Sequence, residues 1–349
     1  MMQRFLSVAL AAALSSILLV GCGGSPASSS AAFGVDYPRS DSDFWKSYIL
    51  YVPLYAVQLG MQLKTTNSQN EAASLAANVQ TLVNHGAKGV LMAPQDTAAV
   101  VPTLNTLAAS KIPVVSVDTR PDAGDVYMVV RADNRAYGEK ACQFLGAKLH
   151  GTGKVLMLEG DLASINGRDR TEAFNQCMSS SFPNIQVFGE PTKWDSAIAL
   201  RTLETQFSAH PDIKGVYMQA SFGLAPTTQV LQRRGLMVPP TDPRHVFAVS
   251  NDGVHEELKN IKAGVIDATV SQPADLYAKI ALGYLKDAVA GKTYRPGPTD
   301  HNSTIIQVRP GVLEDQLPAP LVTADGATFG PVSSVTADDR SLWANNSSN

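Results

Sequence analysis

Polar and aromatic side chains follow several short apolar runs of this sequence, at the positions where buried strands would end. Phe44 and Trp45 come after the first run, and Asp118 comes directly after IPVVSV. Other members of the set follow later runs: Arg170, Trp194, Asp252 and Gln272. Because the carboxyl ends of parallel strands meet at one edge of a sheet, we expect these side chains to line a common crevice.

This mixture of side chains matches the chemistry of a sugar. The C–H faces of a sugar stack on aromatic rings, and each hydroxyl both donates and accepts hydrogen bonds. A planar carboxylate or guanidinium binds two neighbouring hydroxyls, and its charge strengthens both bonds. Each residue alone also has a structural explanation, since Asp252 could cap a helix, Trp194 could lie in a core and Arg170 could form a surface ion pair. The recurrence of such residues after successive strands favours a binding site.

The elements that must position these residues alternate between strands and helices from Ala32 onward. Several strand candidates, such as KGVLMAP and KVLMLEG, are continuous apolar runs, which is typical of parallel strands buried on both faces. Amphipathic helices lie between them, and Leu75, Val79 and Leu82 form the apolar stripe of one such helix. About ten strands over two domain lengths predict an α/β protein with two facing parallel sheets.

The composition excludes several classes of protein. Hydrophobic residues make up 44% and charged residues 17% of the 349, as in an ordinary globular chain that is long enough for two domains. A net charge of −3 offers no basic surface for nucleic acid. The six histidines are scattered without metal-ligand spacing, and no G-x-S-x-G, H-E-x-x-H or C-x-x-C motif occurs. We therefore expect that the protein is not an enzyme and that it binds neither a metal ion nor a cofactor.

The amino-terminal residues have the pattern of an export signal. Arg4 supplies a positive start, residues 6–20 supply an apolar centre too short to span a membrane, and Gly21 precedes Cys22. The stretch LVGC resembles a bacterial lipobox, in which the signal is removed and the cysteine is lipidated. This predicts a signal peptide over 1–21, a lipid-anchored linker over 22–31, and an exported protein held at the periplasmic side of the cell envelope. The alternative is an ordinary signal peptide in which Cys22 has no role.

Two further cysteines, Cys142 and Cys177, remain after Cys22. An exported protein permits a disulfide between them, because disulfides persist in oxidising compartments. Two buried free thiols fit the sequence equally well, so the spacing alone leaves both states open.

The chain resembles the ribose-binding protein family, the sugar-binding components of bacterial ABC importers. Similar stretches run in the family's order from about Ala32 to Val308: TTNSQNEAASLAANVQTLVNHGAKGVLMAPQDTAAV, IPVVSVDTR, RADN, GRDRTEAF, HPDIKGVYMQ, SNDG and IDATVSQ. The resemblance implies a type I periplasmic binding fold, with two doubly wound parallel-sheet lobes and a hinge of three chain crossings.

Carried over to this chain, the crossings fall at Ala132-Asp133, at Ser271-Gln272 and at about 301–303. The predicted first lobe then covers 32–132 and 272–301, and the second covers 133–271 and 302–310. The remaining residues, 311–349, carry many prolines and glycines and no long periodic segment. We expect them to form an extended tail that ends in a short docked piece around Leu342 and Trp343.

The resemblance also implies roles for individual residues. Stacking aromatics of the family match Phe44, Trp45 and Trp194, and its hydroxyl-binding residues match Asp118, Arg170, Asp252 and Gln272. Ser42 stands where the family often has an asparagine.

This sequence departs from ribose binders at two points. Thr119 stands where their arginine follows the aspartate, with Arg120 one place later, and Ala220 followed by Ser221 stands where they have an asparagine. Losing such a partner costs on the order of 1–3 kcal/mol per ligand hydroxyl. We therefore expect another pentose, a hexose or a linear polyol instead of ribose, with Thr119, Arg120 and Ser221 among the binding residues.

The function that the resemblance implies is a monomeric, lipid-anchored binding protein of an ABC importer. It would bind a monosaccharide or sugar alcohol between its lobes and deliver it to a permease, touching the membrane only through the lipid anchor. The alternative is the ligand-binding part of a sugar sensor or chemoreceptor system. Asp118 and Asp252 could also be read as a glycosidase pair, but they match the family's hydroxyl-binding positions. The family fold further places Cys142 and Cys177 on neighbouring helices of the second lobe, which favours a disulfide.

Overall fold

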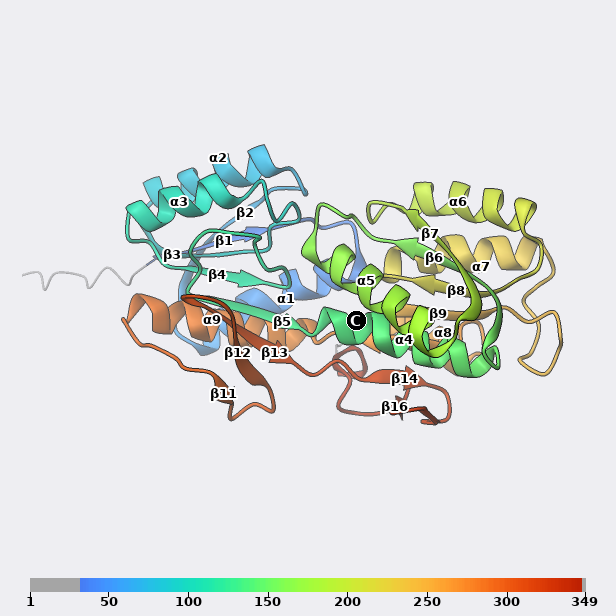
Figure 1. Ribbon diagram of the computed structural model, residues 1–349. Helices are drawn as coiled ribbons and strands as arrows, with labels where there is room; N and C mark the ends of the chain where they lie inside the picture. The colour runs from blue at the N-terminus through green and yellow to red at the C-terminus, as the bar shows by residue number, and fades with distance from the viewer. Residues whose placement is uncertain (1–31, 347–349) are drawn as a thin grey trace, which may run out of the picture. The chain divides into compact units, whose positions relative to one another are not determined.

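The computed structural model describes residues 32–346, which form two α/β lobes, each built on an eight-stranded and mostly parallel sheet (Figure 1). The predicted fold class is thereby confirmed. The predicted signal peptide, Cys22 and the linker lie outside the described residues. Among the described helices, none is long and apolar enough to cross a membrane.

The first lobe is built on the sheet with the strand order β11-β12-β13-β5-β4-β3-β1-β2. Its central strands are buried on both faces, because α2 and α3 pack on one face while α1 and α9 pack on the other (Figure 1). Its elements are β1 (Ala32–Tyr37), α1 (Asp43–Gln58), β2 (Gln62–Asn67), α2 (Ala72–Asn84), β3 (Ala87–Met92), α3 (Val101–Ala109), β4 (Val114–Val117), β5 (Met128–Ala132), α9 (Ala274–Val289), β11 (Gly297–Pro298), β12 (Thr304–Arg309) and β13 (Val312–Leu317).

The second lobe repeats this architecture with the strand order β15-β16-β14-β10-β9-β8-β6-β7. Its elements are α4 (Asn134–Lys148), β6 (Thr152–Glu159), α5 (Ile165–Ser181), β7 (Asn184–Pro191), α6 (Ser196–Ala209), β8 (Ile213–Met218), η1 (Ser221–Gly223), α7 (Leu224–Arg233), β9 (Phe247–Asp252), α8 (His255–Lys262), β10 (Ala268–Ser271), β14 (Leu321–Thr323), β15 (Thr328–Phe329), β16 (Val332–Thr336) and η2 (Trp343–Asn345). A disulfide between Cys142 and Cys177 joins α4 to α5, as the family fold favours. Gly138 allows these two helices to pack closely, because a side chain there would collide with the backbone of α5 at Arg170.

The chain passes from the first lobe to the second after Ala132 and returns after Ser271, where these two crossings are predicted. The third predicted crossing, at 301–303, is wrong. Residues 304–309 form β12, which pairs with β13, and β13 pairs in parallel with β5 of the first sheet. Gly311, with φ of 77°, turns the chain back between β12 and β13. The third crossing therefore lies between Leu317 of β13 and Leu321 of β14.

The carboxyl-terminal residues are also more ordered than the predicted extended tail. Strand β13 completes part of the first sheet, while β14 and β16 extend the second sheet beside β10. The strand character of β13 is hidden in the sequence because Glu314 and Asp315 interrupt an apolar run, yet both carboxylates are fully buried. Leu342 and Trp343 are buried at η2, so the docked end of the chain is confirmed.

Candidate functional site

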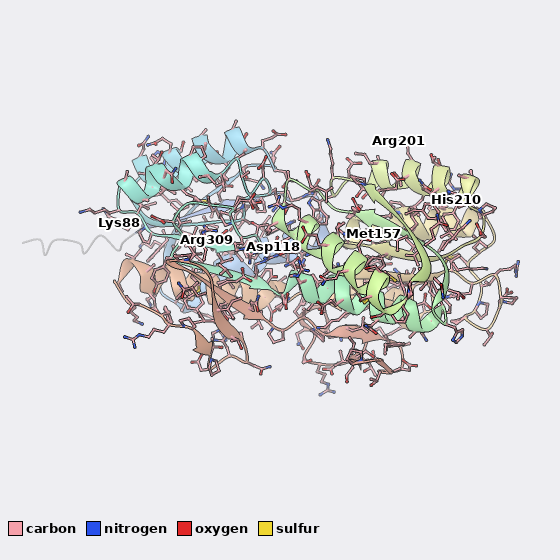
Figure 2. All side chains as sticks on the ribbon, in the orientation of Figure 1. Lys88, Asp118, Met157, Arg201, His210 and Arg309 are labelled. Atoms are coloured by element: carbon pink, nitrogen blue, oxygen red, sulfur yellow. A yellow bond between two sulfur atoms is a disulfide. The ribbon has the colours of Figure 1, made fainter. Side chains whose placement is uncertain are left out.

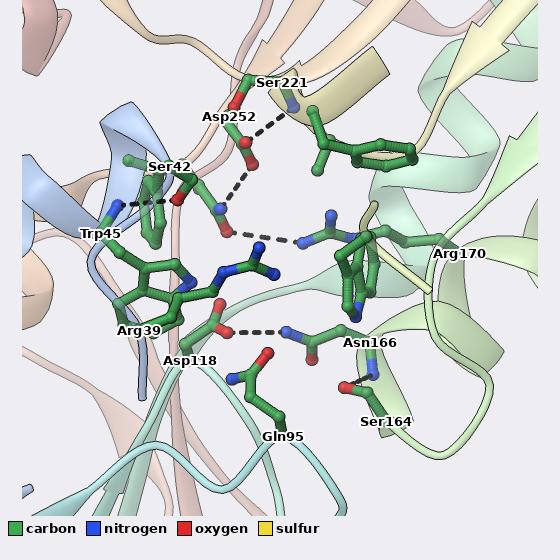
Figure 3. A pocket seen from close by; sticks show the side chains of 15 residues that line it. Arg39, Ser42, Trp45, Gln95, Asp118, Ser164, Asn166, Arg170, Ser221 and Asp252 are labelled. Atoms are coloured by element: carbon green, nitrogen blue, oxygen red, sulfur yellow. Dashed lines mark hydrogen bonds between the residues drawn. The ribbon is translucent and has the colours of Figure 1, made fainter. Parts of the chain in front are cut away.

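The loops that follow the strands of both sheets line a cavity between the lobes. Figure 2 places Asp118 where the two lobes meet, and Figure 3 shows polar side chains converging on the cavity from several elements. Nine of the eleven predicted binding residues line it: Ser42, Phe44, Trp45, Asp118, Arg170, Trp194, Ser221, Asp252 and Gln272. The fold thus brings together residues that lie up to 230 positions apart in the sequence (from 42 to 272).

The first turn of α1 supplies an aromatic wall from the first lobe. The hydroxyl of the N-cap residue Ser42 accepts a hydrogen bond from the backbone N–H of Trp45 at 3.3 Å, which fixes the start of the helix. Phe44 and Trp45 are almost fully buried, with 2% and 6% of their surface exposed, and their rings meet edge to face. Both rings are thus held in place by packing against neighbouring side chains.

Arg170 on α5 is the central cation of the second lobe, with 2% of its surface exposed. Its Nε donates to Asn134 Oδ1 at 2.6 Å, and one Nη donates to the backbone oxygen of Gln219. The guanidinium also lies over the ring of Tyr137, with Cζ 4.7 Å from the ring centre, and faces Trp194 at 5.6 Å. Held on several sides, it presents a fixed positive charge to the cavity.

Asp252 at the end of β9 is the carboxylate of the second lobe. Its φ of 114° is a strained backbone conformation for a residue with a side chain. One carboxylate oxygen accepts from the Ser221 backbone N–H at 2.8 Å, and the other accepts from Gln272 Nε2 at 2.7 Å. Burial raises the pKa of Asp252, and the nearby Arg170 opposes that shift. The contacts fix the orientation of this carboxylate at the cavity wall.

Asp118, after β4, is the carboxylate of the first lobe and has a left-handed backbone, with φ of 65°. Its Oδ2 accepts from Asn166 Nδ2 of the second lobe at 3.0 Å. Burial raises the pKa of Asp118 to about 6, although Arg170 and Arg131 work against the rise. Among the described residues, its buried Oδ1 has no hydrogen-bond partner, and the same holds for Trp194 Nε1. A buried acceptor and a buried donor of this kind suit a ligand that carries hydroxyl groups.

Two of the predicted binding residues, Thr119 and Arg120, do not line the cavity. Thr119 is fully buried, and its backbone oxygen accepts a hydrogen bond from the Ser116 hydroxyl at 2.6 Å. Arg120 turns away and pairs with Glu314 on β13 at 2.8 Å. The buried carboxylate of Glu314 requires a cation, and this need directs Arg120 away from the cavity.

Six lining residues were not predicted: Arg39, Gln95, Ser164, Asn166, Ala220 and Phe222. They follow β1, β3, β6 and β8, so the strand-end rule would have included them if every polar or aromatic residue after these strands, and the small Ala220, had been considered. Arg39 brings a second guanidinium, which points into the cavity region in Figure 3 while two of its nitrogens pair with Asp41. Its charge enters the site from the loop after β1, a segment from which the sequence predicted only uncharged residues.

Asn166 and Asp169 on α5 connect the cavity to an ionic cluster that joins the lobes. Arg131 of β5, with 1% of its surface exposed, donates through Nη2 to Asn166 Oδ1 at 2.7 Å. Both Nη atoms of Arg131 also contact Asp169 Oδ2 at 3.0 Å. Glu314 of the first lobe lies 3.8 Å from the same guanidinium. Contacts between the lobes thus extend from the cavity wall to the hinge.

Within residues 32–346 no group of three or more His, Cys, Asp or Glu side chains is arranged to hold a metal ion. The chemistry of the cavity is instead that of two carboxylates, two guanidinium groups, amides and aromatic rings. This set can bind a neutral polyhydroxylated molecule through stacking and charge-assisted hydrogen bonds.

Known proteins share this sequence pattern and architecture. The family described as "Periplasmic binding protein domain" matches residues 33–293. The chain is 30% identical over 220 residues to the ribose import binding protein of Salmonella typhimurium, covering 63% of this chain and 72% of that one. It is 23% identical over 266 residues to the xylitol-binding protein of Mycolicibacterium smegmatis, covering 75% and 72%.

Solved structures agree on the fold. A solute-binding protein of an ABC transporter from Bacillus halodurans with bound myo-inositol superposes with a TM-score of 0.75 at 17% identity, over 86% of this chain and 97% of that one. A solute-binding protein from Mycobacterium smegmatis with bound glycerol gives a TM-score of 0.69 at 24% identity, over 76% and 90%. The family model matches most of the chain, and the structure has two sheets with a cavity between them. The chain therefore belongs to the periplasmic binding protein family.

Proposed function

We propose that this protein is the substrate-binding component of an ABC importer and binds a neutral monosaccharide or sugar alcohol between its lobes. The observation that carries this proposal is the pair of oriented carboxylates, Asp118 and Asp252, one from each lobe, on either side of Arg170 and between aromatic walls. The ligands of the relatives, which include ribose and xylitol by name, support the same class of ligand.

Binding would proceed by capture and closure. A ligand first stacks on Trp45 of the first lobe, and closure then brings Trp194 and Arg170 of the second lobe against it. Only contacts that are made in the closed form favour closure, and Asp118 with Asn166 is one such contact across the lobes. The closed protein then presents its ligand to a permease.

The lining of the cavity argues for a ligand other than ribose. Thr119 and Arg120 lie outside the cavity, so the arginine that ribose binders carry after the aspartate has no counterpart from that loop. Arg39 supplies a second guanidinium from the loop after β1 instead. A guanidinium in a new place favours a different arrangement of hydroxyls, such as that of another pentose, a hexose or a linear polyol.

Export and anchoring complete the proposal. The signal pattern and Cys22 support an exported lipoprotein, held at the membrane through a lipid on that cysteine. The protein would act as a monomer, because the cavity is complete within one chain. It performs no reaction in this proposal, and its relatives are transport binding proteins.

The test is thermal unfolding against a panel of pentoses, hexoses and linear polyols. Residues 31–349 are suitable, because every described helix and strand lies within them and they form a compact unit of their own. A ligand at 100 times its Kd should stabilise the fold by about 2.7 kcal/mol and raise Tm by several degrees.

Variants locate the site. The Asp252→Ala and Trp194→Ala variants should lose the rise in Tm. Asp242→Ala, which replaces a partly exposed aspartate that pairs with Arg244 outside the cavity, should keep it. If no compound of the panel raised the Tm of the wild type, the proposed ligand class would be contradicted.

A further inference from the structure

The outer face of α1 is apolar where a surface helix is normally polar. The sequence carries no charged residue from Ser47 to Leu63. The inner face of α1 packs on the sheet through Tyr48, Val52 and Ala56, which are buried as expected. A helix with apolar residues all round is normally buried on all sides, so the outer face requires a separate explanation.

Three side chains form that outer face, namely Leu50, Leu54 and Val57, which we call the outer α1 stripe. They are 66%, 58% and 80% exposed. Their spacing of four and three residues places them in one row along the helix. Within the described part of the chain, Leu162 of the second lobe, at 40%, is the remaining strongly exposed large hydrophobic residue. Contiguous exposed apolar surface of this kind marks an interaction site.

The stripe lies at the end of the first lobe where the described chain begins. Helix α1 starts at the cavity with Ser42 and rises 1.5 Å per residue, so Val57 is about 22 Å further along the axis. Strand β2 follows at once, and its Gln62 pairs with Ala32 of β1. The described chain therefore begins, at Ala32, close to the end of the stripe.

Cations flank this end of the helix. Lys286 of α9 donates to the backbone oxygen of Leu59 at 2.7 Å, and exposed Lys279 and Arg295 line the groove beside Leu59. Two carboxylates of this groove have partners, since Asp287 pairs with Lys292 at 2.7 Å and Asp300 pairs with His301 at 2.9 Å. A third, the partly buried Asp275 of α9, lies near Tyr55 and Lys279. Apolar side chains bordered by lysine and arginine are suited to the headgroup region of an anionic membrane.

We propose that the outer α1 stripe and its flanking cations rest on an anionic bilayer surface, as a second membrane contact besides the anchor. The ten residues from Cys22 to Ala31 are rich in Gly and Ser. Ten residues can bridge at most about 36 Å. A lipid on Cys22 thus keeps the stripe at a high effective concentration relative to the bilayer. The contact requires no bound sugar, so it stands apart from the proposed ligand.

The test measures sedimentation of residues 31–349, which lack the anchor, with lipid vesicles. Vesicles of phosphatidylcholine with about one third phosphatidylglycerol are compared with pure phosphatidylcholine at low and high salt. The triple variant Leu50→Ser, Leu54→Ser, Val57→Ser removes the stripe, and Leu162→Ser is the matched control on the other lobe. All four positions are exposed, so an unchanged Tm verifies that the variants are folded.

The wild type and Leu162→Ser should bind the anionic vesicles, less at high salt, and the triple variant should bind at least tenfold more weakly. Failure of the wild type to sediment with either vesicle, or equal binding by the triple variant, would overturn the proposal. Light scattering could instead show that the wild type dimerises, that the triple variant does not, and that neither binds vesicles. This result would assign the stripe to contact with a second copy and would also overturn the proposal. The triple variant should keep its response to a sugar ligand, so failure of this inference is distinguishable from failure of the proposed function.

Discussion

Replacing Asp169 by asparagine should weaken ligand binding, although Asp169 does not line the cavity. Asp169 belongs to the second lobe, and its Oδ2 lies 3.0 Å from both Nη atoms of Arg131 in the first lobe. The same carboxylate lies 3.9 Å from Arg120, also of the first lobe. All these contacts cross between the lobes and would be lost or lengthened if the lobes opened.

The expected magnitude follows from the burial of Arg131. Hydrogen bonds to a charged group contribute about 1.5–3 kcal/mol, and removing one partner of a buried pair can cost more. Glu314 and Asn166 remain beside Arg131 in the variant, so we expect a loss near the lower part of this range, about 2 kcal/mol. If the ligand-free protein is mostly open, this shifts the closing equilibrium and raises Kd by about 30-fold.

Isothermal titration of the wild type and Asp169→Asn with the sugar found in the panel measures this change. Glu172→Gln is the matched control on the same helix, because Glu172 pairs with Arg135 within the second lobe in an exposed contact of 3.1 Å. Exposed pairs contribute about 0–1 kcal/mol, so the Kd of this variant should change less than fivefold. Small-angle scattering of the ligand-free proteins reports whether Asp169→Asn is more open.

An unchanged Kd for Asp169→Asn would refute the reasoning that these contacts stabilise the closed form. Equal losses in Asp169→Asn and Glu172→Gln would refute it as well, because the effect would then come from α5 as a whole and not from contacts between lobes.

Two further predictions concern the cavity wall. Burial raises the pKa of Asp118 to about 6, so the folded protein holds the proton of this carboxyl group more tightly than the unfolded chain does. The bound proton therefore adds up to about 3 kcal/mol to the free energy of unfolding below pH 4. This contribution is lost as the pH rises through 6. Denaturant unfolding across this range should show a decline in the wild type that is smaller in Asp118→Asn, and identical slopes would contradict the assignment. A side chain at Gly160 would overlap the ring of Trp194, so Gly160→Ala should displace that ring and abolish the ligand-induced rise in Tm, whereas Gly283→Ala on α9, with open space around it, should retain the rise.

The two-lobed α/β architecture was predictable because its signals are local. Continuous apolar runs mark strands buried on both faces, and a residue that directly follows such a run lies at the carboxyl edge of its sheet. Asp118 and Asp252 were found by this rule without knowledge of any contact, and Arg170 was found in the helix that follows the loop after β6. Arg39 and Asn166 also follow strands, β1 and β6, but other residues after the same strands were selected instead.

The third crossing could not be read from the sequence in the same way. Strand β13 carries Glu314 and Asp315, which argue against a buried strand when only neighbours in sequence are considered. The structure offsets their burial with partners from elsewhere in the chain, since Arg120 pairs with Glu314, and Tyr284 and His301 contact Asp315. Whether a charged residue can be buried depends on the positions of these partners in space.

The sequence by itself therefore determined the class of fold, the strand ends that line the cavity and the family to which the chain belongs. The tertiary structure decided which way Arg120 points, that Cys142 and Cys177 are joined, and that the row on α1 faces outward. The physical reason is the range of the interactions. Apolar periodicity acts over a few residues, whereas ion pairs, disulfides and exposed faces depend on segments that meet only after the chain has folded.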